Sequence, residues 1–305
     1  MVVLLAALMC AAGGAGAARV DDDGSDAGGA RGVLSSLAAP PGVLLWAEGR
    51  SGTASLYETL VASAHAAGVA LLPCNGIKEG FKSRKEMLHM ADGLGDCGSK
   101  AQRFRRPAVT HIKPMHLTAR GRGVGTPGGL MRRARDAGFG LIVTVRRGNR
   151  LARQVSSFEL RMKQARHAPG SRGWRDNADR EFGDTQRLID EWERSAEVVR
   201  RGVDKAKALG MTVVEVTFEQ NIHAPCDVLA QIAAAAQQVS ADASPPLPAA
   251  LAEGCEVRAS HTASSHRESS LEQRTSPRAA QALRAAFEGT AREWMLDVAR
   301  LDPPQ

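Results

Sequence analysis

A short stretch in the first third of the chain constrains the fold more than any other part of it. An apolar run, Val43 to Ala47, leads into a turn of small and polar residues, and a helix is expected over Ala54 to Ala67. A turn between a buried strand and a helix start leaves the first backbone N–H groups of the helix available to an anion. The guanidinium of Arg50 and the hydroxyl groups around it add further donors. We therefore expect a phosphate group to bind at this turn.

The turn differs from the phosphate-binding loop of nucleoside triphosphatases. That loop ends in Gly-Lys-Ser/Thr and spaces its glycines more widely, whereas here Arg50 stands where the lysine would be needed. A kinase of that class would also need an acidic residue at a strand end to hold Mg²⁺, and no expected strand ends in such an aspartate. A P-loop kinase-like phosphotransferase is therefore kept as an alternative only.

A second strand–turn–helix stretch repeats this chemistry. The apolar run Phe139 to Arg146 is followed by Arg147, and a helix with an Asn149 cap is expected to begin there. Ser156 lies roughly two helical turns further on. Arginine supplies a planar fork of donors that fits a phosphate, and serine supplies a hydroxyl donor. Arg147 and Ser156 therefore predict a second anion site, and two such sites suggest a ligand with two separated phosphates.

Strands and helices alternate along the chain, which favours an α/β fold: a three-layer sandwich with a central parallel sheet. The expected strands are Val43–Ala47, Val69–Pro73, Ala108–Ile112, Phe139–Arg146 and Met211–Phe218. The expected helices are Ala54–Ala67, Leu130–Ala137, Asn149–Met162, Asp184–Leu209, Pro225–Gln238 and Pro277–Val298. We expect the stretches 80–107 and 165–176 to be loops, and Arg274 to lie in a further loop where it either reaches a phosphate or is exposed.

The N-terminal region is expected to stand apart from this single domain, which spans residues 40–305. Residues 1–18 carry no charged side chain and are rich in leucine, valine and alanine, which is typical of a signal peptide or short membrane anchor. Residues 19–39 have the composition of a disordered linker. We therefore expect the secretory pathway, either the Golgi lumen or secretion, with membrane association through the N-terminus.

Cysteine use agrees with that compartment. Four cysteines follow the leader, and an even number in a lumenal protein permits two disulfides. We expect local pairing, Cys74 with Cys97 and Cys226 with Cys255. None of the cysteine spacings is typical of a zinc site.

The formal net charge of +7 suits an anionic cofactor or a polyanion. A non-catalytic protein that binds heparin-like glycans is therefore another alternative. The secretory leader makes nucleic acid an unexpected partner.

Both anion-binding stretches resemble the sulfotransferases that use 3′-phosphoadenosine 5′-phosphosulfate (PAPS). The resemblance implies a P-loop NTPase-like sulfotransferase fold of the Golgi, carbohydrate-modifying type, with PAPS as the donor, no metal, and a glycan or other hydroxyl or amine as the acceptor. It also implies that the first turn holds the 5′-phosphosulfate and the second stretch the 3′-phosphate. The donor-binding residues would be Arg50, Ser51, Gly52, Thr53, Ala54, Ser55, Arg147 and Ser156.

The same resemblance suggests the catalytic residues. Glu79 follows the second expected strand, where many Golgi-type members carry a catalytic carboxylate. His111, in Val-Thr-His, is similar to the histidine base of cytosolic members, and Lys113 to a lysine that assists the base and binds the transferring group. We expect Glu79 to be the base, with His111 as the second candidate.

Overall fold

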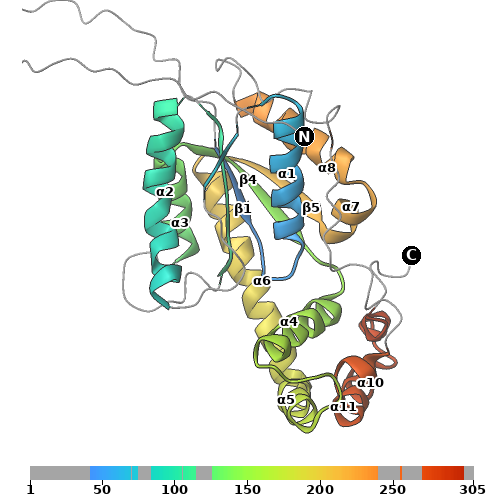
Figure 1. Ribbon diagram of the computed structural model, residues 1–305. Helices are drawn as coiled ribbons and strands as arrows, with labels where there is room; N and C mark the ends of the chain where they lie inside the picture. Colours follow the sequence, from blue (N-terminus) through green and yellow to red (C-terminus); the bar gives the residue numbers. More distant parts are fainter. Residues whose placement is uncertain are drawn as a thin grey trace, which may run out of the picture. The chain divides into compact units, whose positions relative to one another are not determined.

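The computed structural model describes residues 42–69, 71–74, 84–104, 106–114, 126–239, 255 and 270–298, all of which belong to one compact unit. Its centre is a five-stranded sheet, with strand order β2-β3-β1-β4-β5 and every pair parallel (Figure 1). The strands are β1 (Gly42–Trp46), β2 (Leu72–Pro73), β3 (Ala108–Ile112), β4 (Phe139–Arg146) and β5 (Thr212–Thr217). The expected α/β fold with a central parallel sheet is thus confirmed.

The central strand, β1, is apolar along its whole length because it is covered on both faces. Leu44 lies beside Thr110 of β3 on one side and beside Ile142 of β4 on the other. Since all five strands are parallel, the turns that follow them meet at one edge of the sheet. This carboxyl edge therefore gathers the two stretches that the sequence marks as anion-binding.

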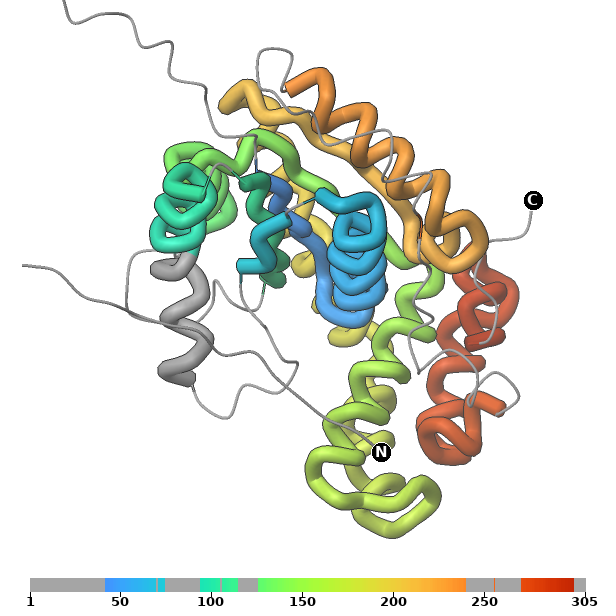
Figure 2. Tube along the Cα trace, turned by 45° about the horizontal axis from the view of Figure 1, so that its top comes forward, coloured from blue at the N-terminus to red at the C-terminus, as the bar shows by residue number. Residues whose placement is uncertain are grey.

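Helices cover both faces of the sheet (Figures 1 and 2). The helices α1 (Thr53–Ala66) and α8 (Pro225–Val239) pack on one face, where Leu45, Leu60 and Ile232 share a core. On the other face lie α2 (Arg84–Phe104), α3 (Pro127–Asp136) and α6 (Thr185–Ala208). The helix that follows β1 thus packs on the opposite face of the sheet from the helix that follows β3.

A third cluster of helices packs around its own core and adjoins the carboxyl edge of the sheet (Figure 1). It comprises α4 (Arg150–Gln164), α5 (Arg172–Phe182), α10 (Leu271–Arg274), α11 (Pro277–Phe287) and a 3₁₀ turn, η2 (Glu293–Leu296). Phe158 meets Trp174 and Phe182 edge to face, with ring centroids 5.0 and 5.4 Å apart. α4 follows β4 directly, so this helical cluster borders the site.

The long helix α6 joins the sheet to the helical cluster, and Trp46 fixes its position. The indole Nε1 of Trp46 donates a hydrogen bond of 3.0 Å to the carbonyl of Val199. Gly202 permits this approach, because a Cβ there would lie 2.4 Å from the same indole nitrogen. The buried indole N–H of Trp46 therefore bonds to a backbone carbonyl of α6, and the glycine at position 202 leaves room for the indole ring.

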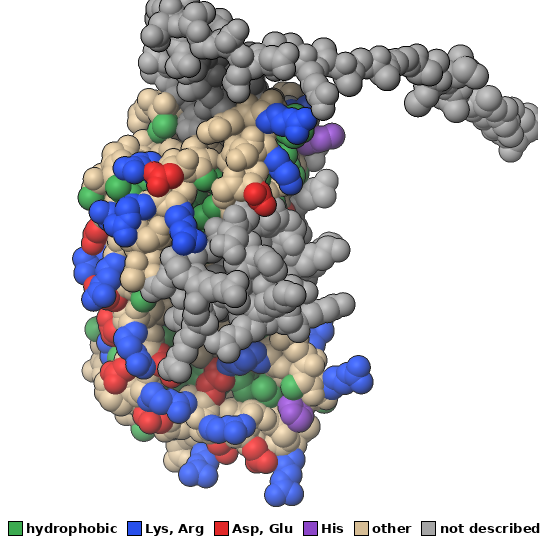
Figure 3. Space-filling model, turned by 90° about the vertical axis from the view of Figure 1, so that its left-hand side faces the viewer, with side chains coloured by type: hydrophobic (Ala, Val, Ile, Leu, Met, Phe, Trp, Pro, Cys, Tyr) green, Lys and Arg blue, Asp and Glu red, His purple; other side chains and the backbone are tan. Residues whose placement is uncertain are grey.

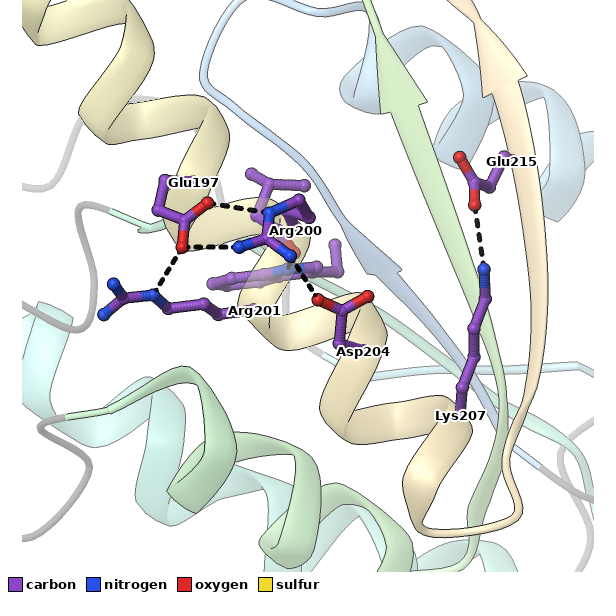
Figure 4. Close-up of polar contacts among 8 residues, drawn as sticks. Glu197, Arg200, Arg201, Asp204, Lys207 and Glu215 are labelled. Atoms are coloured by element: carbon purple, nitrogen blue, oxygen red, sulfur yellow. Dashed lines mark hydrogen bonds and ion pairs between the residues drawn. The ribbon is translucent and has the colours of Figure 1, made fainter.

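The outer surface of α6 carries a network of exposed ion pairs (Figure 4). Glu197 accepts hydrogen bonds from Arg200 and Arg201, which lowers the pKa of its carboxyl to about 2. Arg200 also pairs with Asp204, and Lys207 reaches Glu215 of β5. Basic and acidic side chains are likewise interspersed on the face that Figure 3 shows. Positive charges on this part of the surface are therefore matched by acidic neighbours.

Several expected elements are corrected by the structure. The stretches expected as loops contain two helices, α2 and α5. The glycines of α2 weaken its helix propensity, but Gly98 packs so closely on α3 that a Cβ would lie 2.1 Å from the carbonyl oxygen of Ala137. In α5 the spacing of Trp174, Ala178 and Phe182 buries one face. Packing therefore outweighs local composition in both helices.

Two expected elements are shorter than the sequence suggested by three residues or more. The second strand begins only at Leu72. The last expected helix ends at Phe287, two residues before Gly289, whose φ of +69° interrupts the helical backbone. The bounds expected for β3 and β4 are confirmed without change.

Both expected disulfides are present, Cys74–Cys97 and Cys226–Cys255. The first ties the chain just after β2 to α2, and the second holds α8. They are compatible with a secreted protein. None of the described helices is both long and apolar enough to cross a membrane. The leader and linker expected over residues 1–39 lie outside the described residues.

Candidate anion-binding site

The turn between β1 and α1 has the backbone geometry of an anion-binding loop. Arg50 and Gly52 both take left-handed conformations, with φ of +64° and +85°, so that the chain reverses sharply before α1. Ser51 is buried, and its hydroxyl donates to the carbonyl of Glu48 at 2.6 Å. Gly52 is the N-cap of α1, and no side chain caps the first turn. The backbone N–H groups at this helix start are therefore placed to meet a ligand.

The remaining residues expected at this turn begin α1. Thr53 is buried, and Ala54 and Ser55 are half-buried in the first helical turn. They lie where the sequence expects them, beside the uncapped helix start.

The second stretch forms the junction between β4 and α4. Arg147 follows the last residue of β4, and Asn149 caps α4 by accepting a hydrogen bond of 2.8 Å from the backbone N–H of Ala152. The side-chain amide of Asn149 also donates to the carbonyl of Asp297 at 2.9 Å. Asn149 thus joins the first turn of α4 to the chain that follows η2. The Asn149 cap expected from the sequence is confirmed.

The structure brings the two stretches into contact. Arg50 donates from Nε and Nη2 to the hydroxyl of Ser156, at 3.2 and 3.0 Å, across a sequence separation of 106 residues. Because β1 and β4 are neighbours in the sheet, the turn after β1 faces the helix after β4. Two segments that the sequence marks independently therefore line one place.

The face of α4 that meets the β1–α1 turn carries further charged residues, which the sequence alone did not single out. Arg153, one helical turn before Ser156, lies 3.5 Å from the carboxylate of Glu48, and both side chains are nearly buried. Glu159 accepts hydrogen bonds of 2.8 and 3.0 Å from Arg274 of α10. The spacing of these α4 residues was the available signal, since positions three apart share a helix face.

Arg274, whose role the sequence left open, is almost fully buried. It is thus part of the site's surroundings rather than an exposed loop residue.

Arg147 interacts electrostatically with Glu219 and with three other arginines. Burial lowers the pKa of its guanidinium to about 10; Glu219 opposes this, while Arg274, Arg50 and Arg153 add to it. The guanidinium carbon lies 4.4 Å from the centroid of the Phe218 ring. Among the described residues, its Nε has no hydrogen-bond partner. A half-buried cation near three others is an arrangement that an anionic ligand would stabilise.

The two candidate catalytic residues that the structure describes lie on the other side of β1. His111 of β3 is paired in register with Leu45, on the face that α1 covers, and its ring meets that of Tyr57 edge to face at 5.4 Å. Burial raises the pKa of the Tyr57 hydroxyl. Lys113 directly follows β3 and is also buried. Glu79 lies outside the described residues.

No group of His, Cys, Asp and Glu side chains suited to a metal ion occurs in the part of the chain that the structure describes. No family model, curated protein or solved structure matches the chain. The fold and the site by themselves define an α/β protein with a cationic site at the carboxyl edge of a parallel sheet.

Proposed function

We propose that this chain is a PAPS-dependent sulfotransferase that transfers a sulfuryl group to a hydroxyl or amine of a carbohydrate. The observation that carries the proposal is the contact of Arg50 with Ser156. Each residue belongs to a separate stretch that resembles one half of a PAPS site, and the two halves meet at the carboxyl edge of the sheet. A ligand with two separated phosphates accounts for both halves at once.

In the proposed complex, the uncapped start of α1 and the guanidinium of Arg50 hold the 5′-phosphosulfate. Arg147 and Ser156 hold the 3′-phosphate. The Ser156 hydroxyl, which accepts from Arg50 in the structure, donates to the phosphate instead. Charge-assisted hydrogen bonds to phosphate are stronger than the guanidinium–hydroxyl pair that they replace.

The reaction is an in-line displacement at sulfur. The acceptor oxygen or nitrogen forms a bond to sulfur as the bond between sulfur and the 5′-phosphate oxygen breaks, and adenosine 3′,5′-bisphosphate leaves. The base, Glu79 or His111, takes the acceptor proton. Lys113 and Arg50 stabilise the charge that develops on the transferring and leaving groups. Fixing donor and acceptor side by side supplies the rest of the rate enhancement.

Two features support a secretory-pathway enzyme with a carbohydrate acceptor. Disulfides persist in oxidising compartments, and both disulfides of the structure join segments close in sequence. The positive charge of the whole chain suits an anionic glycan. We therefore propose the Golgi lumen as the place where it acts.

The test is a pair of measurements on the full chain. Calorimetric titration should show binding of adenosine 3′,5′-bisphosphate without added metal, and radiolabelled PAPS should transfer its sulfate to one member of a glycan panel. Mg²⁺-dependent binding of ATP in place of the bisphosphate would favour a kinase. Retention on heparin without any nucleotide binding would favour a non-catalytic glycan-binding protein. Either result would overturn the proposal.

A further inference from the structure

The junction between β5 and α7 (Phe218–His223) reaches into the anion site. A capping box fixes where α7 begins: the Thr217 hydroxyl accepts from the backbone N–H of Gln220 at 3.0 Å, and the Gln220 side chain accepts from the backbone N–H of Thr217 at 2.8 Å. The two residues that follow Thr217 are therefore held in defined directions. Phe218 and Glu219 are these residues.

Phe218 touches both halves of the site. Its ring faces the guanidinium of Arg147, with 4.4 Å between the guanidinium carbon and the ring centroid. One edge of the same ring rests against the β1–α1 turn, where a Cβ at Gly52 would lie 2.5 Å from the ring. The aromatic ring thus contacts both the turn proposed to hold the 5′-phosphosulfate and the arginine proposed to hold the 3′-phosphate.

Glu219 contacts the β4–α4 junction, which is the second half of the site. Its carboxylate is buried, with 5% of the residue exposed, and Oε1 accepts a hydrogen bond of 3.0 Å from the backbone N–H of Gly148. Gly148 is the residue between Arg147 and the Asn149 cap. The negative charge of Glu219 also acts on Arg147, where it opposes the repulsion from Arg50, Arg153 and Arg274. It therefore fixes the β4–α4 junction and keeps the Arg147 cation in place.

We propose that Phe218 and Glu219 form a brace that sets the separation of the two anion-binding halves. The brace makes the site select a nucleotide with phosphates at both its 3′ and 5′ positions over a 5′-monophosphate. Both are positioning residues, because they act through Arg147, Gly148 and Gly52. The inference rests on the proposed function, which assigns each half of the site to one phosphate.

The experiment compares two ligands in each variant: adenosine 3′,5′-bisphosphate and adenosine 5′-monophosphate. The ratio of their dissociation constants measures what the 3′-phosphate contributes. In Glu219→Gln the carboxylate that holds the junction is lost, so affinity for the bisphosphate should fall about tenfold or more. Affinity for the monophosphate should stay within about twofold, because the β1–α1 turn is unchanged. The selectivity for the bisphosphate over the monophosphate should therefore fall, because the affinity for the bisphosphate falls and the affinity for the monophosphate does not.

Two further variants separate positioning from general damage. Phe218→Leu, which removes the ring, should also reduce selectivity, whereas Phe218→Tyr, which keeps the ring, should preserve it. In an Arg147→Gln background, Glu219→Gln should change selectivity no further, because it acts through that arginine. Glu215→Gln is the matched control. Among the described residues, this exposed carboxylate of β5 pairs with Lys207 (Figure 4) and with Arg146, and neither belongs to the site.

The outcomes distinguish this inference from the proposed function. If the wild-type chain binds neither nucleotide, the proposed function fails, and the brace fails with it. If the wild-type chain is selective and Glu219→Gln is equally selective, the brace alone is overturned. An equal loss of affinity for both nucleotides would also overturn it, since that result describes a damaged fold. If thermal unfolding shows that the Glu219→Gln protein is not folded, the comparison of Phe218→Leu with Phe218→Tyr tests the brace instead.

Discussion

Arg50 directs two nitrogens of its guanidinium at the single hydroxyl of Ser156, at 3.2 and 3.0 Å. A hydroxyl is a weak partner for a guanidinium, and a phosphate is a much stronger one. Arg50 also holds a left-handed backbone conformation, which costs a non-glycine residue about 1 kcal/mol or more. The turn thus holds Arg50 in an unfavourable backbone conformation with its guanidinium against a hydroxyl; under the proposed function, a phosphate of the donor takes the place of that hydroxyl.

Removing either member of this pair should weaken donor binding. We expect Ser156→Ala to lower the affinity for adenosine 3′,5′-bisphosphate about tenfold, because one hydrogen bond to a charged group is lost. Arg50→Ala should have a larger effect, since it removes a cation. Calorimetric titration measures both. Ser157→Ala is the control, because in the described part of the chain the Ser157 hydroxyl accepts from the exposed Arg161, which lies outside the site. Equal affinities for Ser156→Ala and Ser157→Ala would contradict the site.

The binding of the bisphosphate should depend on pH through Arg147. Its guanidinium has a pKa of about 10 in the free protein, and a bound phosphate would raise that value. Full affinity is therefore expected below pH 10 and should decline as the pH rises through about 10, where the free protein loses the charge that binding requires. Titrations from about pH 8 to about pH 11 test this. In Arg147→Gln the decline should disappear; the same decline in that variant would assign it to another group.

The Glu48–Arg153 pair should matter mainly for folding. Its atoms lie 3.5 Å apart, and 12% and 10% of the two side chains is exposed. Glu48→Gln would leave the Arg153 guanidinium buried without its counter-charge, and we expect the free energy of unfolding to fall by about 2 kcal/mol or more. Denaturant titration gives the value. Glu193→Gln is the control because Glu193 pairs with Arg150 and Arg292 at the surface, where a loss below about 1 kcal/mol is expected. Similar losses in the two variants would show that Glu48 is better solvated than the structure indicates.

Docking of α6 on β1 should depend on Gly202. A Cβ at this position would meet the Trp46 indole at 2.4 Å, so Gly202→Ala should reduce stability by about 1–3 kcal/mol. The thermal midpoint should fall accordingly. Gly95→Ala provides the comparison, because that helical glycine of α2 has open space around it and alanine favours helix there. A Gly202→Ala protein as stable as Gly95→Ala would mean that α6 shifts away from Trp46 without loss.

Local patterns predicted some elements well and others poorly. β3 and β4 are rich in apolar and β-branched residues and begin directly after Pro107 and Gly138, so their bounds could be read from the sequence without error. α2 could not, because glycines interrupt it and its support comes from a disulfide and from close contact with α3. The sequence favours a loop over part of α5 for a related reason: most of its residues are polar, and few of them form the face that packs on Phe158.

The candidate site likewise has a part that local patterns predict and a part that depends on long-range contacts. The local sequence predicts the two halves, because each is a strand–turn–helix whose donors lie within a few residues of one another, at Arg50 and at Arg147. That the halves meet depends on the tertiary fold, since β4 lies beside β1 only after the chain has passed through β2, β3 and α3. The tertiary fold also places Glu48, Arg274 and Glu219 around the site. Their partners are distant in sequence, and no local pattern of residues encodes contacts of that kind.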